Sequence, residues 1–418
     1  MFRWLFGFLL VLPTHAQDTR RVTEPAFPPS CAVLQARLTS VDESQPDTRR
    51  IQQALDTCAP GGAVELRPDG SRAAFLSGPL DLRAGVTLRV GASVTLFASR
   101  NPRDYDVAPG RCGTVDQSGR GCRALINGDH VAGAAVMGEG TIDGRGGLKL
   151  LNQDVTWWDL AEKARAGGNQ NCPRLIVLSY SSDFTLYRIT LKNSPNFHVY
   201  FGNGNGFTAW GVIINTPKNA RNTDGIDPSA STNVTITNCF IYTGDDNVAV
   251  KAGGPVSHIT VAHNHFYAGH GMSIGSETSG GAEAIRVTDL SIDGADNGLR
   301  IKSNNTRGGL VHDVVYSDVC IRNTKNPILM DTHYTASRGP ETSLIPSFTS
   351  IVLRNIRILT GGKITLDGYD ERHRLDLTFD NVYLDAPAST PSAVSHADVT
   401  RSAATFPIAC SDKFVPLP

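Results

Sequence analysis

Four short runs of the chain share one pattern: GDDNVAVK at 244–251, GHGMSIG at 269–275, NGLRIK at 297–302 and NPILMD at 326–331. When their last residues are aligned, the steps between them are 24, 27 and 29 residues. A repeat of this length, built from strands and turns with almost no helical periodicity, is typical of a solenoid whose coils stack on one another.

Further β-rich runs separate these four and extend the pattern in both directions. Several short strands per coil predict an all-β fold, a right-handed parallel β-helix. A TIM barrel would suit the length, but it needs eight amphipathic helices. Only two helical stretches are indicated: 47–58, with Asp47 as its N-cap and a role in capping the N-terminal end of the solenoid, and 154–166. The intervening strands are expected at 233–241, 258–265, 285–292, 311–321, 348–358 and 375–384.

Alternation of side chains along each matched strand assigns its two faces. The apolar residues, such as Val248 and Val250, should point into the solenoid, and the residues between them should point out. Coils are about 4.8 Å apart, so equivalent residues of successive coils are neighbours in space. The predicted interior residues of the next two coils are Met272, Ile274, Leu299 and Ile301, and the predicted outward ones are Ser273, Gly275, Arg300 and Lys302.

Composition excludes several classes of protein. Of the 418 residues, 40% are hydrophobic and 19% are charged, which argues against a disordered chain. The net charge of −1 argues against a polybasic nucleic-acid binder. Residues 1–16 combine Arg3, an apolar run at 4–12 and a small residue, Ala16, which predicts a signal peptide and a secreted product. No apolar run is long enough for a membrane span, so residues 17–418 are expected to form one soluble β-helix catalytic domain.

Eight cysteines fit an oxidising compartment. Cys31 and Cys58 flank the first predicted helix, and Cys112 and Cys122 bracket a glycine-rich loop, so disulfides Cys31–Cys58 and Cys112–Cys122 are predicted. No pair has the tight Cys-x-x-Cys spacing of a zinc site, and no metal is expected. The sequence does not decide whether the other four are paired or simply buried: Cys172, Cys239, Cys320 and Cys410.

The coil register gathers acidic residues on one patch. Asp224, Asp246, His270 and Asn297 fall in one column, with Asp245 beside Asp246. Carboxylates one rung apart repel one another when all are ionised, so one of them should have a raised pKa. A protonated and an ionised carboxyl side by side are what glycosidic cleavage requires.

Each of these residues also has a simpler interpretation. Asp245 and Asp246 could be calcium ligands or turn residues. Asp227, before Pro228, could have no role other than capping its own turn. Arg300 and Lys302 could be an ordinary solvated face. Their alternation beside the acids instead favours a seat for an anionic substrate group.

Taken together, the motifs resemble those of glycoside hydrolase family 28, the polygalacturonases. Four signatures occur in order: Asn-Thr-Asp at 222–224, Gly-Asp-Asp at 244–246, Gly-His-Gly at 269–271 and Arg-Ile-Lys at 300–302, with Tyr334 downstream. The resemblance extends over roughly residues 30 to 385. The sequences at 222–228 and 269–278 look most like those of bacterial secreted endopolygalacturonases.

The resemblance implies a role for each matching residue. Asp245 would be the general acid, Asp224 and Asp246 would activate the attacking water with inversion, and His270 would tune the protonation of Asp245. It further implies endo-acting hydrolysis of α-1,4-galacturonosyl linkages in polygalacturonate (de-esterified pectin) by a monomer, with no cofactor or metal. The substrate-binding residues that it implies are Asn222, Arg300, Lys302 and Tyr334.

Three alternatives remain open. An exo-polygalacturonase would have one end of the groove blocked, but no long insertion separates the catalytic motifs, although loops at 101–123 and 335–346 could narrow the groove. A calcium-dependent pectate lyase and a non-catalytic glycan-binding β-helix share the expected fold class.

Overall fold

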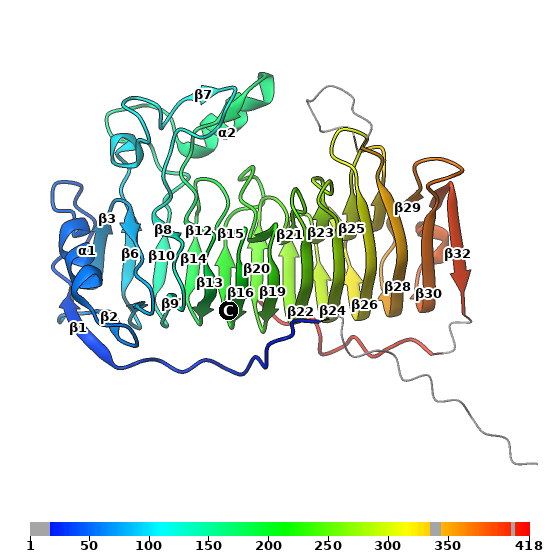
Figure 1. Ribbon diagram of the computed structural model, residues 1–418, viewed down its shortest axis with the longest axis horizontal. Coiled ribbons are helices and arrows are strands. Elements are labelled where there is room, and N and C mark those ends of the chain that lie inside the picture. Colours follow the sequence, from blue (N-terminus) through cyan, green and yellow to red (C-terminus); the bar gives the residue numbers. More distant parts are fainter. Residues whose placement is uncertain (1–16, 335–343, 403–405) are drawn as a thin grey trace, which may run out of the picture.

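The computed structural model describes residues 17–334, 344–402 and 406–418. The predicted signal peptide at 1–16 and most of the loop expected at 335–346 lie outside the described residues. The chain is a right-handed parallel β-helix, whose coils stack along the long axis of the molecule (Figure 1).

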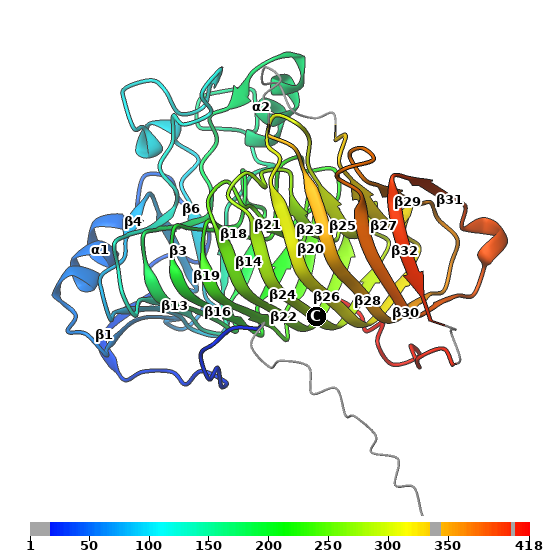
Figure 2. The same ribbon diagram turned by 45° about the vertical axis from the view of Figure 1, so that its right-hand side comes forward.

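One eleven-stranded parallel sheet forms a side of the solenoid, and we call it the site sheet because it carries the residues described below. Each of its strands belongs to a different coil (Figure 2). The strands are β4 (Leu80–Asp81), β8 (Ile126–Asp129), β12 (Ile176–Ser179), β15 (Val199–Gly202), β18 (Ile226–Ser229), β21 (Val248–Val250), β23 (Met272–Gly275), β25 (Asn297–Lys302), β27 (Asn326–Asp331), β29 (Ile364–Asp367) and β31 (Ser392–Ser395).

The remaining sides belong to a nineteen-stranded sheet. In the first coils two separate strands form these sides, and from β22 onward one long strand follows both. Its strands are β1 (Ser30–Gln35), β2 (Ala63–Arg67), β3 (Ala74–Ser77), β5 (Thr87–Val90), β6 (Thr95–Ala98), β9 (Ala135–Met137), β10 (Thr141–Asp143), β13 (Ser182–Tyr187), β14 (Thr190–Lys192), β16 (Asn205–Trp210), β17 (Ile213–Asn215), β19 (Thr232–Thr237), β20 (Phe240–Thr243), β22 (Val256–Ala268), β24 (Ala282–Asp293), β26 (Leu310–Arg322), β28 (Ser347–Ile358), β30 (Leu375–Leu384) and β32 (Ala397–Arg401).

The interior is filled by ladders of apolar side chains. Along the site sheet, Ile226 pairs with Val248, Val248 with Met272, and Met272 with Leu299, and all four are fully buried. The predicted coil register and interior face are therefore confirmed. The run expected as one strand at 233–241 is instead divided between β19 and β20. The division falls at Asn238, whose φ of 55° is left-handed.

Two excursions rise above the first coils (Figure 1). The first, between β6 and β8, contains the 3-10 helix η1 (Pro102–Tyr105) and β7 (Val115–Asp116). The second, between β10 and β12, contains α2 (Trp157–Lys163), η2 (Ala164–Ala166) and β11 (Asn169–Gln170), in agreement with the helix predicted at 154–166. Antiparallel pairing of β7 with β11 ties the two excursions together.

The N-terminal helix is α1 (Thr48–Thr57), whose Ile51 and Leu55 are fully buried. Its role as a cap of the solenoid stays a prediction. Asp47 is the N-cap residue, but its carboxylate does not cap the helix. It instead accepts hydrogen bonds from Arg50 (2.6 Å) and from the amide of Leu76 (3.3 Å), so the expectation of a side-chain cap was wrong.

The cysteines form three disulfides within the described residues. Cys31–Cys58 and Cys112–Cys122 are as predicted, and Cys320–Cys410 ties the C-terminal tail to β26. Cys172 and Cys239 are buried free thiols. The remaining 3-10 turn is η3 (Pro387–Ser389). Within the described ranges, no helix has the length and apolar character of a membrane span.

Candidate active site

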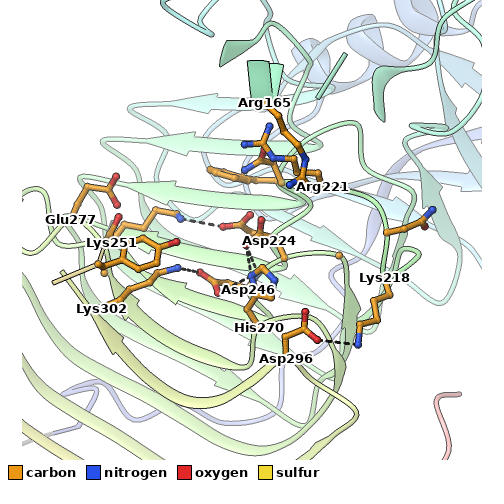
Figure 3. Close-up of a pocket in the computed structure, with 18 of the residues that line it drawn as sticks. Arg165, Lys218, Arg221, Asp224, Asp246, Lys251, His270, Glu277, Asp296 and Lys302 are labelled. Carbon is orange, nitrogen blue, oxygen red and sulfur yellow. Dashed lines mark hydrogen bonds and ion pairs between the residues drawn. The ribbon is translucent and has the colours of Figure 1, made fainter. Parts of the chain in front are cut away.

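The predicted column of polar residues lies at the edge where the strands of the site sheet begin. Asp224, Asp246 and His270 each lie two residues before β18, β21 and β23, and the pairing of these strands brings them into register. They line a pocket of about 740 Å³, together with Asp245, Lys251 and Lys302 (Figure 3). The structure therefore brings together the four residues predicted to be catalytic.

Glycines are required around His270. Gly269 and Gly271 have φ of 67° and 72°, in the region that favours glycine. A Cβ atom on Gly269 would lie 2.5 Å from the carbonyl oxygen of Asp245, and one on Gly271 would lie 2.2 Å from that of Gly298. The Gly-His-Gly motif thus lets this turn lie directly against the neighbouring coils.

Asp245 and His270 form the accessible pair of the site. Nδ1 of His270 lies 2.9 Å from Oδ1 of Asp245, and the two side chains are 31% and 20% exposed. Burial alone would raise the pKa of Asp245, but the hydrogen bond and charge of His270 hold this pKa well below its usual range. In return, although burial opposes it, Asp245 raises the pKa of His270. The pair therefore holds one proton, which rests on the imidazole.

Asp246 is buried beneath this pair and is bound by three donors. Lys302 donates to its Oδ2 (2.8 Å), while Ser273 (2.8 Å) and Arg300 (3.3 Å) donate to its Oδ1. Burial would raise the pKa of Asp246, but the two cations outweigh burial and lower it. Arg300 and Lys302 point outward as predicted, yet they are only 6% and 7% exposed. The alternative interpretation of an ordinary solvated face was therefore wrong, because both cations also bind Asp246.

Asp224 shares a buried cation with Asp227. Nζ of Lys251 lies 3.1 Å from Asp224 and 3.5 Å from Asp227. Burial raises the pKa of Asp224 to about 7; Lys251 opposes this shift, while Asp245 and Asp246 add to it. Burial also raises the pKa of Asp227 well above its usual range. The sequence predicted one raised carboxyl pKa without identifying it, and the structure assigns this property to Asp224 and Asp227.

The alternative role of Asp227 as a turn cap was wrong. Asp227 lies within β18, and neither of its carboxylate oxygens has a hydrogen-bond partner. Its position in the strand places its side chain on the outward face, where Nζ of Lys251 lies 3.5 Å away.

Buried residues support the backbone of Asp224. The imidazole of His198 donates from Nδ1 to the carbonyl oxygen of Asp224 (3.0 Å) and accepts at Nε2 from Thr216 (2.7 Å). Burial lowers the pKa of His198 to about 4, so this tautomer is neutral. Thr223 donates to the carbonyl of Ala220 (2.6 Å) and accepts from the amide of Gly244 (3.0 Å), which joins the Asp224 turn to the Asp245 turn.

The residues predicted to bind substrate surround the acids. Asn222 lines the same pocket and has a left-handed φ of 57°, which asparagine tolerates. The ring of Tyr334 lies 5.3 Å from the guanidinium of Arg300 and 5.4 Å from Nζ of Lys302.

Two further arginines lie above Asp224 (Figure 3): Arg165 comes from the excursion that carries α2, and Arg221 comes from the turn between β17 and β18. Arg221 donates to the carbonyl oxygen of Ala161 (2.7 Å), and Arg165 donates to Glu162 (2.7 Å).

One group of side chains in the described ranges lies close enough to share a metal ion: ligand atoms of Asp245, Asp246 and His270 are within 4.8 Å of one another. Asp246 already accepts from three donors, and one of the three potential ligands is an imidazole. Calcium prefers six to eight oxygen ligands, so this donor set does not fit the calcium-dependent alternative.

Four residues of the site were not predicted from the sequence: Lys251, Ser273, His198 and Phe197. For Lys251 and Ser273 a signal existed: Lys251 ends the matched run that contains Asp246, and Ser273 was predicted to be an outward residue in the coil of His270. His198 and Phe197 come from a coil without a charged motif, and their contacts in the structure identify them.

Comparison with known proteins identifies the family to which this chain is similar. The model of the family described as "Glycosyl hydrolases family 28" matches residues 70–405. An endo-polygalacturonase of Pectobacterium carotovorum subsp. carotovorum is 46% identical over 373 residues, covering 88% of this chain and 90% of that protein. A polygalacturonase of Ralstonia nicotianae is 43% identical over 426 residues, covering 87% of this chain and 80% of that protein.

A solved structure agrees with both. The polygalacturonase from Erwinia carotovora ssp. carotovora superimposes with a TM-score of 0.87 at 43% identity, covering 92% of this chain and all of that one. The chain therefore belongs to family 28 of the glycosyl hydrolases.

Proposed function

We propose that the protein is an endo-acting, inverting hydrolase of α-1,4-galacturonosyl linkages in polygalacturonate. The observation that carries the proposal is the cluster of Asp224, Asp245 and Asp246 in one pocket beside Arg300 and Lys302. Carboxyl groups in different environments can act as acid and base, and adjacent cations suit an acidic sugar. The relatives named endo-polygalacturonase support the endo mode.

Asp245 is the general acid. It is more exposed than Asp224 and Asp246, whose side chains are 4% and 2% exposed, so it can reach a glycosidic oxygen above the pocket floor. The proton moves from Nδ1 of His270 to Asp245 and then to the leaving oxygen. His270 therefore keeps the acid supplied with a proton although the resting carboxyl is ionised.

Asp224 and Asp246 hold the attacking water from below. Asp246 remains ionised because Lys302 and Arg300 bind it, and it orients the water. Asp224, with a pKa of about 7, accepts the proton of this water as the new carbon–oxygen bond forms. The glycosidic carbon–oxygen bond breaks on the opposite side, and the anomeric configuration inverts.

Two measurements on polygalacturonate test the proposal. Proton NMR of the first product should show the inverted anomer, and chromatography of early digests should show a spread of oligomers. Retention of configuration would overturn the mechanism, and release of monomer or dimer alone would indicate exo action. Unsaturated products lost on chelation would indicate a lyase, and no reducing-sugar release would indicate a binding protein.

We also propose that the protein is secreted and acts as a monomer. The composition of residues 1–16 and the three disulfides support export to an oxidising compartment.

A further inference from the structure

A second cavity lies along the site sheet on the N-terminal side of the active-site pocket. Its volume is about 390 Å³, and Asn127, Val177 and Tyr200 line it. These residues pair with one another in the successive strands β8, β12 and β15, and Tyr200 pairs in turn with Asp227. At the usual strand spacing, Val177 lies about 10 Å, or two rungs, from Asp227. The second cavity thus follows the same line of outward positions as the active site.

An aromatic wall separates the two cavities. The ring of Phe197, which lines the active-site pocket, lies between two cations: the guanidinium of Arg174 is 4.7 Å from its centre, and Nζ of Lys251 is 4.8 Å away on the catalytic side. Arg174 also lies 4.5 Å from the ring of Tyr200 inside the second cavity. An extended sugar chain leaving the catalytic pocket toward the N-terminal coils would therefore meet Arg174 next.

The second cavity has a positive lining. Arg120, Arg123 and Arg174 line it, and no Asp or Glu is among the described residues that form the lining. Arg123 also pairs with Asp81 (2.6 Å), but both side chains are more than 40% exposed, so the pair is open to solvent and to exchange. Arginine binds carboxylates through two parallel hydrogen bonds, so this lining is suited to bind a carboxylate group.

The loop that carries two of these arginines is firmly held. The Cys112–Cys122 disulfide closes it, the amide of Gly121 donates to Oδ1 of Asn171 (2.7 Å), and β7 pairs with β11. A site whose groups are already ordered loses less entropy when a ligand binds. These restraints keep Arg120 and Arg123 next to the cavity before substrate arrives.

We propose that this second cavity binds the carboxylate of a galacturonate unit distant from the cleaved bond, on the side opposite Arg300 and Lys302. The inference rests on the proposed function, because the distant unit belongs to the same chain that occupies the active site. Long substrates gain this contact and short ones do not reach it. The cavity therefore makes cleavage depend on chain length.

The test compares wild type with an Arg120→Gln/Arg123→Gln variant on oligogalacturonates from the trimer to the octamer. We expect kcat/KM for the octamer to fall about tenfold, as for the loss of a charge-assisted hydrogen bond, while kcat/KM for the trimer stays unchanged. Trimer cleavage also reports that the variant is folded. The control is Arg72→Gln/Arg188→Gln, which removes the same charge from exposed pairs with Asp69 and Glu139 outside both cavities.

The outcomes separate the two proposals. Equal losses on trimer and octamer, or no loss on the octamer, would overturn the second site while the wild-type activity stands. The same octamer-specific loss in the control would assign the effect to net charge and would also overturn it. If the wild type cleaves no oligomer, the proposed function fails, and this inference fails with it.

Discussion

Lys251 places its ammonium group 3.1 Å from a carboxylate oxygen of Asp224. Three other acids act on the same ammonium: Asp227, Glu277 and Asp246. Together with Asp224 they raise the pKa of Lys251 well above its usual range although burial opposes them, so Lys251 stays charged. The position of this cation determines how readily Asp224 ionises.

Lys251→Met is therefore expected to shift the pH dependence of the reaction. Without the cation, the pKa of Asp224 rises further above about 7, by about 1 unit. Asp224 must be ionised to accept a proton, so the acidic limb of kcat/KM should move to higher pH. Lys251→Arg should restore the limb, and Lys218→Met, which removes a cation paired with Asp296 (3.2 Å), should leave it in place. An unmoved limb in Lys251→Met would contradict this role.

Asp245→Asn should abolish proton donation without disturbing the fold. Asp245 is partly exposed and hydrogen-bonds to His270, so its loss leaves no buried carboxylate unpaired. We expect kcat on polygalacturonate to fall about 1,000-fold, within the range for loss of a general acid or base. The thermal midpoint should remain that of wild type. Near-normal turnover would remove Asp245 from the mechanism.

Lys302→Met should lower kcat and raise KM together. A residue that only binds substrate changes KM, but Lys302 also donates to Asp246 (2.8 Å), which orients the water. Tyr334→Leu provides the contrast, since it removes the ring that contacts the two cations and should affect mainly KM. Steady-state kinetics of both variants distinguish substrate binding from support of Asp246. An unchanged kcat in Lys302→Met would show that Asp246 orients the water without the help of Lys302.

The sequence predicted the arrangement of the site well because a β-helix converts sequence spacing into spatial proximity. Once the last residues of the matched strands were aligned, the column of Asp224, Asp246 and His270 followed from strand pairing alone. The interior face followed from alternation, since Val248 and Met272 are fully buried. Both conclusions depend on local periodicity, which the sequence displays directly.

The sequence could not predict quantities that depend on contacts between coils. Arg300 and Lys302 have outward positions, but their burial against Asp246 depends on the walls of the pocket. The identity of the raised carboxyl depends on where Lys251 sits between Asp224 and Asp227. The excursion that carries α2 contributes Arg165 to the pocket, and no repeat register places it there.

Asp227→Asn should change the pH dependence of stability. Burial raises the pKa of Asp227 above its usual value of 3.8, so the folded state binds this proton more tightly than the unfolded state. The contribution of Asp227 to stability is therefore present below about pH 4 and is lost as the pH rises toward the folded pKa, at no more than about 1.4 kcal/mol per pH unit. Asparagine does not titrate, so the variant should gain on wild type as the pH rises above about 4.

Urea unfolding at several pH values measures this difference. The control Asp81→Asn removes an exposed carboxylate that pairs with Arg123, and it should change stability little across the same range. A constant difference between Asp227→Asn and wild type would mean that Asp227 ionises equally in the folded and unfolded states.

Loss of the Cys320–Cys410 disulfide should destabilise the protein more than loss of Cys112–Cys122. The first closes a loop of 90 residues and the second a loop of 10. Loop-closure entropy in the unfolded chain assigns them about 4.6 and about 2.7 kcal/mol. Cys410 also fixes the tail whose Val415 carbonyl accepts from the Tyr267 hydroxyl (2.8 Å), so this tail should detach with it. Unfolding of the two double-alanine variants in urea compares the free energies, and the reverse order would show that native contacts, rather than unfolded-chain entropy, govern the contribution of these disulfides.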